Sequence, residues 1–286
     1  MRARVLTNKA IVITGAASGI GEALALGLSR RGARLLLADI DAQGLQRVAV
    51  TLQAQGSVCH TLVTDTGCEA SIAALAHATL QHLGGADMVI NNAGVALMAP
   101  VDKLQTSDAH WLMNINFWGV VHGCRAFIPQ LANRPDALLV NVSSIFAMVS
   151  MPTQSIYNAS KAAVRGFSDA LREELRPMGI DVLCVHPGGI RTNIANAARI
   201  TDVTLVADSD QEMREAFTRL ARTSPAQAAE VIIRAIQTRK TRVLVGGDAV
   251  LLDLVFRLFP AKASHWFSLL GQSLRKRAKS WSRSAT

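Results

Sequence analysis

The sequence has few of the features that mark secreted or membrane-spanning proteins. Its four cysteines are far apart and form no Cys-x-x-Cys pair; they are Cys59, Cys68, Cys124 and Cys184. This spacing indicates reduced, buried thiols in a cytoplasmic protein. The apolar run that follows the first basic residues spans only residues 10–13, which is too short for an export signal. We therefore expect a cytoplasmic protein, and we expect no bound metal.

Acidic residues are missing from residues 255–286. Seven basic residues lie in this stretch: Arg257, Lys262, Arg275, Lys276, Arg277, Lys279 and Arg283. The whole chain has a formal charge of +9, so 9 − 7 leaves +2 for the residues before the tail. Because the excess positive charge belongs to the tail, the basic composition does not indicate a nucleic-acid-binding protein.

Tyrosine occurs once, at Tyr157, with Ser144 thirteen positions before it and Lys161 four positions after it. If a helix begins near residue 155, Tyr157 and Lys161 lie one turn apart on the same face. A positive charge close to a phenol favours the phenolate, and the hydroxyl of Ser144 could hold the same substrate oxygen. Taken alone, this spacing is more often a helix face with a snorkelling lysine.

The length of 286 residues, half of them hydrophobic, suits one large α/β domain with an appendage. Apolar runs alternate with helical patterns, which predicts a Rossmann-like, doubly wound parallel sheet of about seven strands with helices on both faces. We expect this domain over residues 1–247 and a basic amphipathic helical tail over residues 248–286. The predicted strands are 10–14, 33–38, 58–63, 86–90, 138–142, 180–185 and 242–245, and the predicted helices are 22–31, 42–55, 69–83, 107–131, 155–176 and 224–238.

A glycine-rich turn, Gly15-Ala-Ala-Ser-Gly19-Ile-Gly21, links the first predicted strand to the first helix. Glycines let the backbone approach a pyrophosphate, and a helix N-terminus stabilises its charge. By itself such a turn is equally compatible with a purely structural loop. Its position between a strand and a helix favours a dinucleotide site.

Acidic residues end the next two predicted strands. Asp39 is placed to accept hydrogen bonds from the adenosine ribose, and its charge would repel a 2′-phosphate, so NAD is favoured over NADP. Ala17, inside the glycine turn, offers no cation to such a phosphate, which agrees. Asp65 could meet the adenine amino group. The alternatives are that each aspartate only caps the helix that follows it.

Small and amide residues follow later strands. Asn91-Asn92-Ala93-Gly94 comes after the fourth predicted strand, and Pro187-Gly188 comes after the sixth. Small side chains there suit close contact between the backbone and a cofactor, although such clusters also form ordinary turns. Asn116, inside an apolar helical stretch, needs a hydrogen-bond partner, which a water or a locally opened helical turn would provide.

In combination these motifs resemble the short-chain dehydrogenase/reductase family over residues 9–246. The motifs are Thr14-Gly15-x-x-x-Gly19-x-Gly21, Asn91-Asn92-Ala93-Gly94, Asn116, Ser144, Tyr157-x-x-x-Lys161, and Pro187-Gly188 with Thr192. The resemblance implies that Tyr157 is the acid/base and that Ser144 orients the substrate oxygen. It also implies that Lys161 lowers the tyrosine pKa and holds the nicotinamide ribose, while Asn116 fixes a water in a proton relay.

The resemblance also implies a set of cofactor contacts. It adds backbone contacts from Ile20, Ala93 and Ile190, with Thr192 near the carboxamide. The expected NAD site therefore comprises Gly15, Ser18, Gly19, Ile20, Gly21, Asp39, Asp65, Asn91, Ala93, Gly94, Tyr157, Lys161, Pro187, Gly188, Ile190 and Thr192. In the family, the helices that carry Asn116 and Tyr157 commonly build a dimer or tetramer, so we expect a homo-oligomer.

The expected substrate is a hydrophobic secondary alcohol or its ketone. Apolar pocket candidates are Leu97, Met98, Phe146, Met148, Met151 and Ile194, and residues 193–223 are expected to form a mobile lid. Two other functions stay open: an NADP(H)-dependent carbonyl reductase, with Arg30, Arg31 or Arg34 reaching the phosphate, and a non-catalytic dinucleotide-binding regulatory protein. The complete set of Asn116, Ser144, Tyr157 and Lys161 favours an enzyme.

The tail reads as two helices, over residues 248–259 and 261–281, that break at Pro260 and are apolar on one side and basic on the other. Asp253 and Arg257 interrupt the first, so it does not span a bilayer. Either the tail packs over the substrate entrance or a neighbouring subunit, or it lies on an anionic membrane surface. In the second case Trp266, Phe267 and Trp281 would lie at the headgroups. We favour packing.

Overall fold

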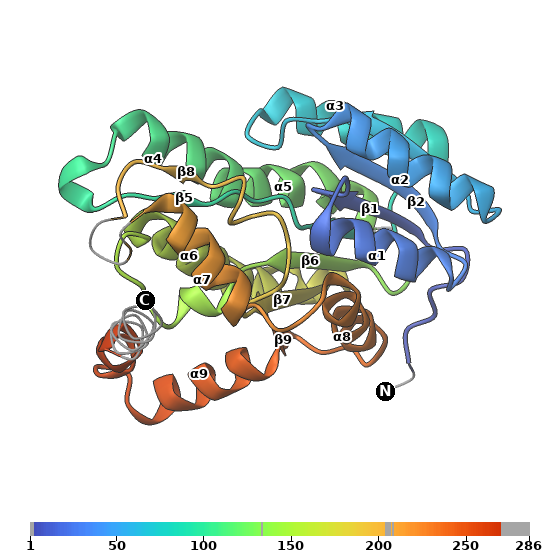
Figure 1. Ribbon diagram of the computed structural model, residues 1–286. Helices are drawn as coiled ribbons and strands as arrows, with labels where there is room; N and C mark the ends of the chain where they lie inside the picture. Colours follow the sequence, from blue (N-terminus) through green and yellow to red (C-terminus); the bar gives the residue numbers. More distant parts are fainter. Residues whose placement is uncertain (1–2, 133, 204–206, 208, 270–286) are drawn as a thin grey trace.

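A seven-stranded parallel sheet forms the centre of the molecule (Figure 1). The computed structural model describes residues 3–132, 134–203, 207 and 209–269. Within them the strand order is β3-β2-β1-β4-β6-β7-β9. The strands are β1 Ala10–Thr14, β2 Arg34–Asp39, β3 Cys59–Val63, β4 Met88–Asn91, β6 Leu138–Val142, β7 Asp181–Pro187 and β9 Arg242–Val245. The predicted fold class is confirmed, and each predicted strand lies within two residues of the observed one.

Helices connect the strands and cover both faces of the sheet (Figure 1). They are α1 Gly19–Ser29, α2 Ala42–Ala54, α3 Glu69–Leu83, α4 Thr106–Met113, α5 Gly119–Leu131, α6 Ser155–Leu175, α7 Asp210–Leu220, α8 Pro225–Gln237 and α9 Gly247–Leu258. The helix predicted over residues 107–131 is interrupted by a π-helical turn, η2 (Asn114–Trp118). Helix α1 begins three residues earlier than predicted, so its first turn contains two glycines of the turn after β1.

The two faces of the sheet bury alternate residues of each strand. In β1, Ile11 and Ile13 pack with α1, α2 and α8, whereas Ala10 and Val12 pack with α3, α5 and α6. Helices cover both faces, so strand residues are apolar at successive positions rather than at every second one. This explains why the strands read as continuous apolar runs in the sequence.

Strand β1 lies between β2 and β4, and this is where the direction of the chain through the sheet reverses. From β1 the chain proceeds outward to β2 and β3, then returns to β4 and proceeds to the other edge. The connections on either side of this point diverge, which leaves a crevice beyond the carboxyl ends of the strands. The motifs that end β1, β4 and β6 all reach this edge.

Two segments outside the sheet cover the region beyond β6. The short strand β5 (Leu97–Met98) pairs in parallel with β8 (Arg199–Ile200). Of the two, β8 lies within the predicted lid. Helix α9 and the helical residues 263–269 pack on η3 (Ile145–Ala147) and β9. Residues 270–286, with Trp281 and five of the seven basic residues of the tail, lie outside the described residues. In the described part of the chain, none of the helices is long and apolar enough to cross a membrane.

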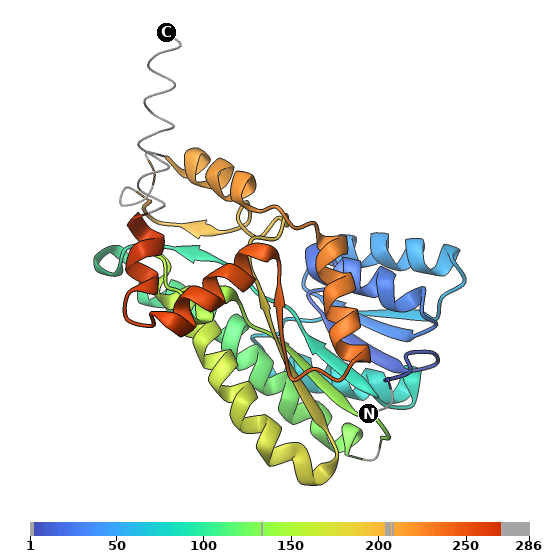
Figure 2. The same cartoon turned by 90° about the horizontal axis from the view of Figure 1, so that it is seen from below.

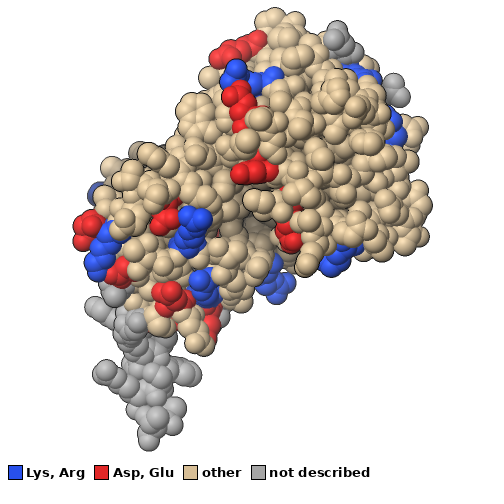
Figure 3. All heavy atoms as spheres, turned by 90° about the horizontal axis from the view of Figure 1, so that it is seen from above, with Lys and Arg blue, Asp and Glu red and all other residues tan. Residues whose placement is uncertain are grey.

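Charged side chains of the two signs are interspersed on the face seen in Figure 3, and most of that face is formed by other residues. Among the described residues, several charged side chains are paired across elements, such as Arg47 with Glu22 and Arg31 with Glu230. This distribution agrees with the nearly neutral body expected from the sequence.

The buried side chain of Arg4 connects several segments at the amino-terminal edge of the sheet. The guanidinium of Arg4, 1% exposed, donates to Asp181 Oδ2 at 2.5 Å and to the carbonyl oxygens of Asp136 and Ile236 at 3.1 and 3.0 Å. Arg239 also donates to Asp181, at 3.2 Å. Burial lowers the pKa of Arg4, and the carboxylate of Asp181 opposes that effect. The charge is therefore stabilised by Asp181.

We predict that Asp181→Asn lowers the free energy of unfolding by about 1–3 kcal/mol, because it leaves a buried guanidinium without its carboxylate. The control is Glu173→Gln, which removes an exposed pair with Arg176 and should cost less than about 0.5 kcal/mol. Urea unfolding of both variants measures the difference. Equal losses in the two variants would contradict the assigned role of Asp181.

Candidate active site

Tyr157 and Lys161 lie in the first two turns of α6, which begins at Ser155. The Lys161 Nζ atom is 5.9 Å from the centre of the tyrosine ring. The ammonium is buried and donates to the carbonyl oxygen of Val142, the last residue of β6, at 3.0 Å. Ser143 Oγ donates to the Lys161 carbonyl at 2.7 Å. These two bonds fix the start of α6 against the end of β6.

Ser144 is the second residue after β6, and its side chain lies near the Tyr157 phenol. Its Oγ also accepts from the backbone N–H of Phe146 at 3.1 Å, which caps the short helix η3. Behind it, Nδ1 of the buried His186 lies 3.3 Å from the Ser144 carbonyl oxygen. Burial lowers the pKa of His186 to about 4, so its imidazole is neutral. His186 thus supports the backbone at Ser144.

The electrostatics of this cluster differ from the expectation in one respect. Burial raises the pKa of Tyr157, and the hydrogen bond to Ser144 acts in the opposite direction. Burial also lowers the pKa of Lys161 to about 8. The sequence predicted a lowered tyrosine pKa. In this structure, loss of solvation has the larger effect, because the half-buried phenol lies beside the buried ammonium.

Asn116 lies in the π-helical turn η2 and is fully buried. Its Oδ1 accepts from the Val95 N–H at 2.8 Å, and its Nδ2 donates to the Val95 carbonyl at 3.0 Å and to Ser160 Oγ at 3.3 Å. The opened helical turn that the sequence analysis considered is therefore present. The partner of the amide is the backbone of the segment after β4, and α6 contributes through Ser160.

Gly94 lies between Asn116 and Lys161. A Cβ atom at this position would be 3.3 Å from both Asn116 Oδ1 and Lys161 Nζ. The structure thus brings Asn116, Ser144, Tyr157 and Lys161 to one region beyond β4 and β6. This arrangement can hold an oxygen atom between two hydroxyl groups and exchange a proton with it.

The glycine turn occupies the crevice beside this cluster. Gly15 has a positive φ of 66°, and a Cβ atom there would be 2.8 Å from Ala93 Cα. At Gly21 a Cβ atom would be 2.0 Å from the Gly15 carbonyl oxygen. Ser18 is exposed and precedes α1 without a side-chain cap, so Gly19 and Ile20 begin a helix whose first N–H groups have no partner within the helix. Such an N-terminus suits a phosphate group.

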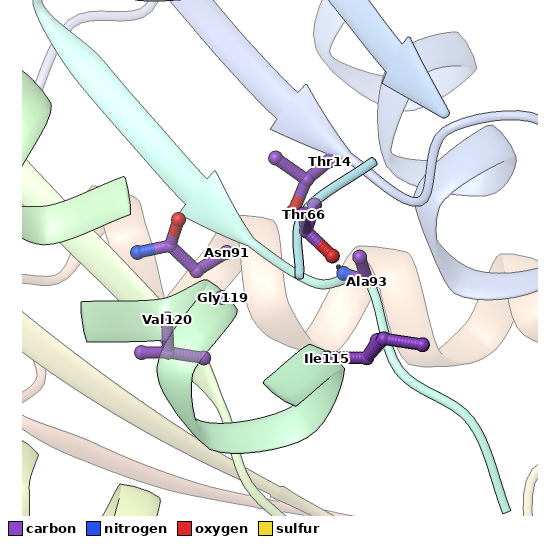
Figure 4. Close-up of a pocket in the computed structure, with 7 residues that line it drawn as sticks. All are labelled: Thr14, Thr66, Asn91, Ala93, Ile115, Gly119 and Val120. Carbon is purple, nitrogen blue, oxygen red and sulfur yellow. Dashed lines mark hydrogen bonds between the residues drawn. The ribbon is translucent and has the colours of Figure 1, made fainter. Parts of the chain in front are cut away.

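Thr14 and Asn92 connect the end of β1 to the segment after β4 at the base of the crevice. They were not among the site residues predicted from the sequence. Thr14 Oγ1 accepts from the N–H groups of Asn92 and Ala93 at 3.0 and 3.1 Å. Asn92 Nδ2 donates to the carbonyl oxygens of Thr14 and Gly15, each at 3.0 Å. Figure 4 shows the small pocket where β1, β4 and the start of α5 meet at this point. These bonds depend on β1 and β4 being neighbours.

Asn91 differs from the rest of its motif. Its buried Nδ2 donates to Asn141 Oδ1 at 2.9 Å and lies 3.4 Å from Cys124 Sγ. Asn141 in turn donates to Ser168 Oγ at 3.0 Å. In Figure 4 the Asn91 side chain points away from Thr14 and Ala93. The amide of Asn91 therefore links β4 to β6 and α6 rather than facing the crevice.

Asp39 lies at the end of β2, beside the glycine turn. One carboxylate oxygen accepts from the Ala17 N–H at 2.9 Å and the other from the Asp41 N–H at 3.0 Å. The cap of α2 is Asp41, which accepts from Gly44, so the alternative that Asp39 caps this helix is wrong. The physical reason is that Asp39 still belongs to the strand, and its carboxylate faces the turn.

Asp65 follows β3, and its side chain is exposed. Its Oδ1 accepts from the Gly67 N–H at 2.9 Å in a local turn. The residue before α3 is Cys68, which makes no side-chain cap, so the alternative that Asp65 caps α3 is also wrong. Asp65 therefore stays a candidate for the cofactor site at this edge of the sheet.

Residues 187–192 approach α1 from β7. A Cβ atom at Gly19 would be 3.0 Å from Thr192 Cγ2, and the Thr192 N–H donates to the Ile190 carbonyl at 2.8 Å. Asp248 at the start of α9 supports this segment, because it accepts from the Gly189 N–H at 2.6 Å. A Cβ atom at Gly188 would be 2.3 Å from the same carboxylate. Asp248 could not be identified from the sequence, since only the fold brings the tail to this turn.

Four of the six predicted pocket residues divide between two apolar clusters, and Leu97 and Ile194 belong to neither. Met98 is buried with residues of the lid segment, and Met151 packs against them. Phe146 packs with the tail, and its ring meets the ring of Tyr157 edge-on at 6.4 Å between centres. Met148 is buried, and its sulfur accepts from Arg242 at 3.0 Å. Phe146 is thus the pocket candidate in contact with the tyrosine.

Known proteins share this architecture and much of this sequence. Residues 9–202 match the family model described as short chain dehydrogenase. The chain is 41% identical over 254 residues to the putative oxidoreductase SadH of Mycobacterium tuberculosis (strain ATCC 25618 / H37Rv), covering 88% of this chain and 91% of that protein. It is 30% identical over 280 residues to dehydrogenase/reductase SDR family member 7B of Xenopus tropicalis, covering 96% of this chain and 88% of that one.

A solved structure agrees with these matches. The crystal structure of a short chain dehydrogenase/reductase from Burkholderia phymatum in complex with NAD superposes on this chain with a TM-score of 0.80. The two sequences are 30% identical, and the superposition covers 89% of this chain and 96% of the other. The similarity therefore extends over the sheet, its helices and the crevice.

The tight contacts of the glycine turn lead to a prediction. Gly21→Ala should lower the free energy of unfolding by about 1–3 kcal/mol, because the new methyl group overlaps the Gly15 carbonyl. Gly166→Ala is the control, since a Cβ atom at this position in α6 meets nothing within 4 Å. It should stabilise the protein by about 0.5–1 kcal/mol. Denaturant unfolding measures both, and a harmless Gly21→Ala would contradict the observed packing.

Proposed function

This chain belongs to the short-chain dehydrogenase/reductase family of oxidoreductases, and from this premise we propose that it interconverts a hydrophobic alcohol and its carbonyl compound with NAD(H). The observation that carries the proposal is the cluster of Ser144, Tyr157 and Lys161 beside the glycine turn. In this proposal the Tyr157 hydroxyl exchanges a proton with the substrate oxygen, and Ser144 Oγ holds that oxygen. The Ser144 side chain acts to lower the pKa of the Tyr157 phenol, which supports the pairing.

Lys161 and Asn116 support the tyrosine in this proposal. The Lys161 ammonium, held by the Val142 carbonyl, lies one helical turn from the phenol and favours its ionised form. The raised pKa of Tyr157 means that the acid form predominates before ligands bind. Asn116 keeps the segment after β4 at a fixed distance from α6 and so positions the lysine, through the close approach at Gly94.

The residues of the crevice fit a nicotinamide dinucleotide. The glycines at positions 15 and 21 let the turn pack tightly on Ala93 and on itself, where a Cβ atom has no space, and the start of α1 directs N–H groups outward. Ser18, Ile20, Ala93, Ile190 and Thr192 would contribute the further contacts along the groove. When bound, this cofactor supplies the hydride transfer, while the protein provides the geometry and the proton.

We favour NAD over NADP because of Asp39. Its carboxylate lies at the end of β2, where the adenosine ribose would bind, and a 2′-phosphate would meet its negative charge. Two of the arginines considered for a phosphate are engaged elsewhere. Arg31 donates to the Gly27 carbonyl and to Glu230. Arg34 donates to the carbonyl oxygens of Asn8 and Leu83. Arg47 is near the turn, since it donates to the Ala17 carbonyl, but Glu22 pairs with its charge.

A hydrophobic substrate is favoured by the apolar side chains around Tyr157. Phe146 meets the tyrosine ring, and Phe267 from the tail meets Phe146, with 6.2 Å between ring centres. The tail is fixed there by a hydrogen bond from the Ser150 N–H to Ser264 Oγ at 2.9 Å. The tail in this position forms one wall of the substrate entrance. We also propose a homodimer or homotetramer, as in other family members, built on α5 and α6.

Replacing the tyrosine tests catalysis against simple cofactor binding. In Tyr157→Phe, the turnover of a hydrophobic alcohol should fall about 10²–10⁴-fold, because the proton-transfer group is lost. The affinity for NADH should change far less than the turnover, since the ring, Lys161 and the other cofactor contacts remain. Absorbance at the reduced-nicotinamide band measures turnover, and NADH fluorescence measures binding. A wild-type protein that binds NADH but turns over no alcohol or ketone in a broad panel would instead be a regulatory protein.

Cofactor choice has a test of its own. Asp39→Asn should weaken NAD binding about tenfold and raise the ratio of NADP to NAD affinity, because the charge and one strong acceptor are lost. The control is Asp41→Asn, two residues away, which keeps the cap of α2 and should leave the ratio unchanged. Titration of both cofactors with each variant measures the ratio. Tighter binding of NAD to Asp39→Asn would contradict the assignment.

A further inference from the structure

The outer surface of the tail is unusually apolar. Seven large apolar side chains that are 42% to 63% exposed lie within residues 250–269: Val250, Leu251, Leu254, Leu258, Phe259, Trp266 and Leu269. We call these seven residues the tail face. Figure 2 shows α9 and the helical residues after it on the outside of the molecule. Elsewhere in the described chain, exposed apolar residues are spread over several elements.

Helix α9 is apolar on two opposite sides. Its inner side carries Ala249 and Asp253, which are buried, and Leu252 and Phe256, which pack in the cluster around η3. Four residues of the tail face, at positions 250, 251, 254 and 258, lie on the outer side. The expectation of a basic outer side is therefore wrong for α9. Large apolar side chains exposed together on one side of a helix are uncommon in a monomeric protein, so the outer side calls for a further partner.

After Asp253, the charged residues of the tail are all basic. Asp253 is turned inward, where it pairs with Arg242 at 2.5 Å and with Arg257 at 2.9 Å. Asp248 is engaged by the Gly189 N–H. Lys262 and the mostly exposed Arg257 lie in the same segment, and residues 255–286 contain seven basic and no acidic residues. The surroundings of the tail face therefore favour an anionic partner.

We propose that the tail face docks on the surface of a bilayer that contains anionic phospholipids. Leucine, phenylalanine and tryptophan side chains beside lysine and arginine are the combination that inserts into the headgroup region of a membrane. The basic residues attract the anionic headgroups, and the apolar side chains enter the boundary with the acyl chains. The protein lies on the membrane and does not span it.

A second copy of the chain fits the tail face less well. A two-fold interface brings the same patch of each protomer together, so Arg257 and Lys262 of both copies would meet across it. Like charges at such an interface oppose association. An anionic lipid surface matches both the apolar and the charged components, and this is why we commit to it. The proposal concerns binding alone and does not depend on the proposed activity.

The test is co-sedimentation of the full chain with vesicles. We expect pelleting with mixed phosphatidylcholine and phosphatidylglycerol vesicles, weak pelleting with phosphatidylcholine alone, and release by high salt. In the triple variant Leu251→Ser, Leu254→Ser, Leu258→Ser, vesicle binding should fall at least about tenfold. Thermal unfolding and NADH binding should stay as in the parent chain, because these side chains face outward.

The control is a second triple variant, Val50→Ser, Val58→Ser, Leu80→Ser. These residues are 48% to 54% exposed and lie on α2, before β3 and on α3, away from the tail. This variant should pellet like the parent chain. Absence of pelleting with anionic vesicles, or equal losses in the two triple variants, would overturn the proposal. One further result would overturn it. In that result the parent chain does not bind vesicles but is a dimer by sedimentation equilibrium, and the first triple variant is a monomer.

Discussion

The bond from the buried Lys161 ammonium to the Val142 carbonyl is the contact on which the site depends. A buried cation is costly unless it is held, and here the end of β6 holds it. The same bond fixes where α6 begins, and α6 carries Tyr157. Since Ser144 is the second residue after Val142, the two hydroxyls meet as a consequence of this junction. Burial also determines the protonation states, with a raised pKa for the phenol and a lowered one for the ammonium.

The crevice depends on a second constraint, which is the close approach of β1 and β4. Thr14 and Asn92 exchange hydrogen bonds across this junction, and Gly15 lies against Ala93 with no space for a side chain. These contacts with the segment after β4 fix the conformation of the glycine turn. The start of α1, where we propose that a phosphate binds, and the tyrosine of α6 are thereby set on one edge of the sheet, although they are far apart in the chain.

The tail connects the site to the surface. Its inner side contacts Phe146, which contacts Tyr157, and its first acidic residue, Asp248, holds the turn after β7. Its outer side is apolar and is accompanied by basic charge. In the proposed function, the inner side of the tail forms one wall of the substrate entrance. If the outer side docks on a bilayer as proposed, that entrance lies close to the lipid surface. Apolar alcohols dissolved in such a surface would then be within reach.

The sequence alone determined the strand and helix order, the glycine turn and the tyrosine–lysine spacing, because these follow from local periodicity and from which residues permit tight turns. The contacts between distant segments depended on the tertiary structure. Spacing could not show that Asn91 turns into the interior, that the π-helical turn gives Asn116 a backbone partner, or that Asp41 and not Asp39 caps α2. Nor could it show that α9 is apolar outward. The physical reason is that side-chain direction, burial and pKa depend on neighbours that only the folded sheet brings together.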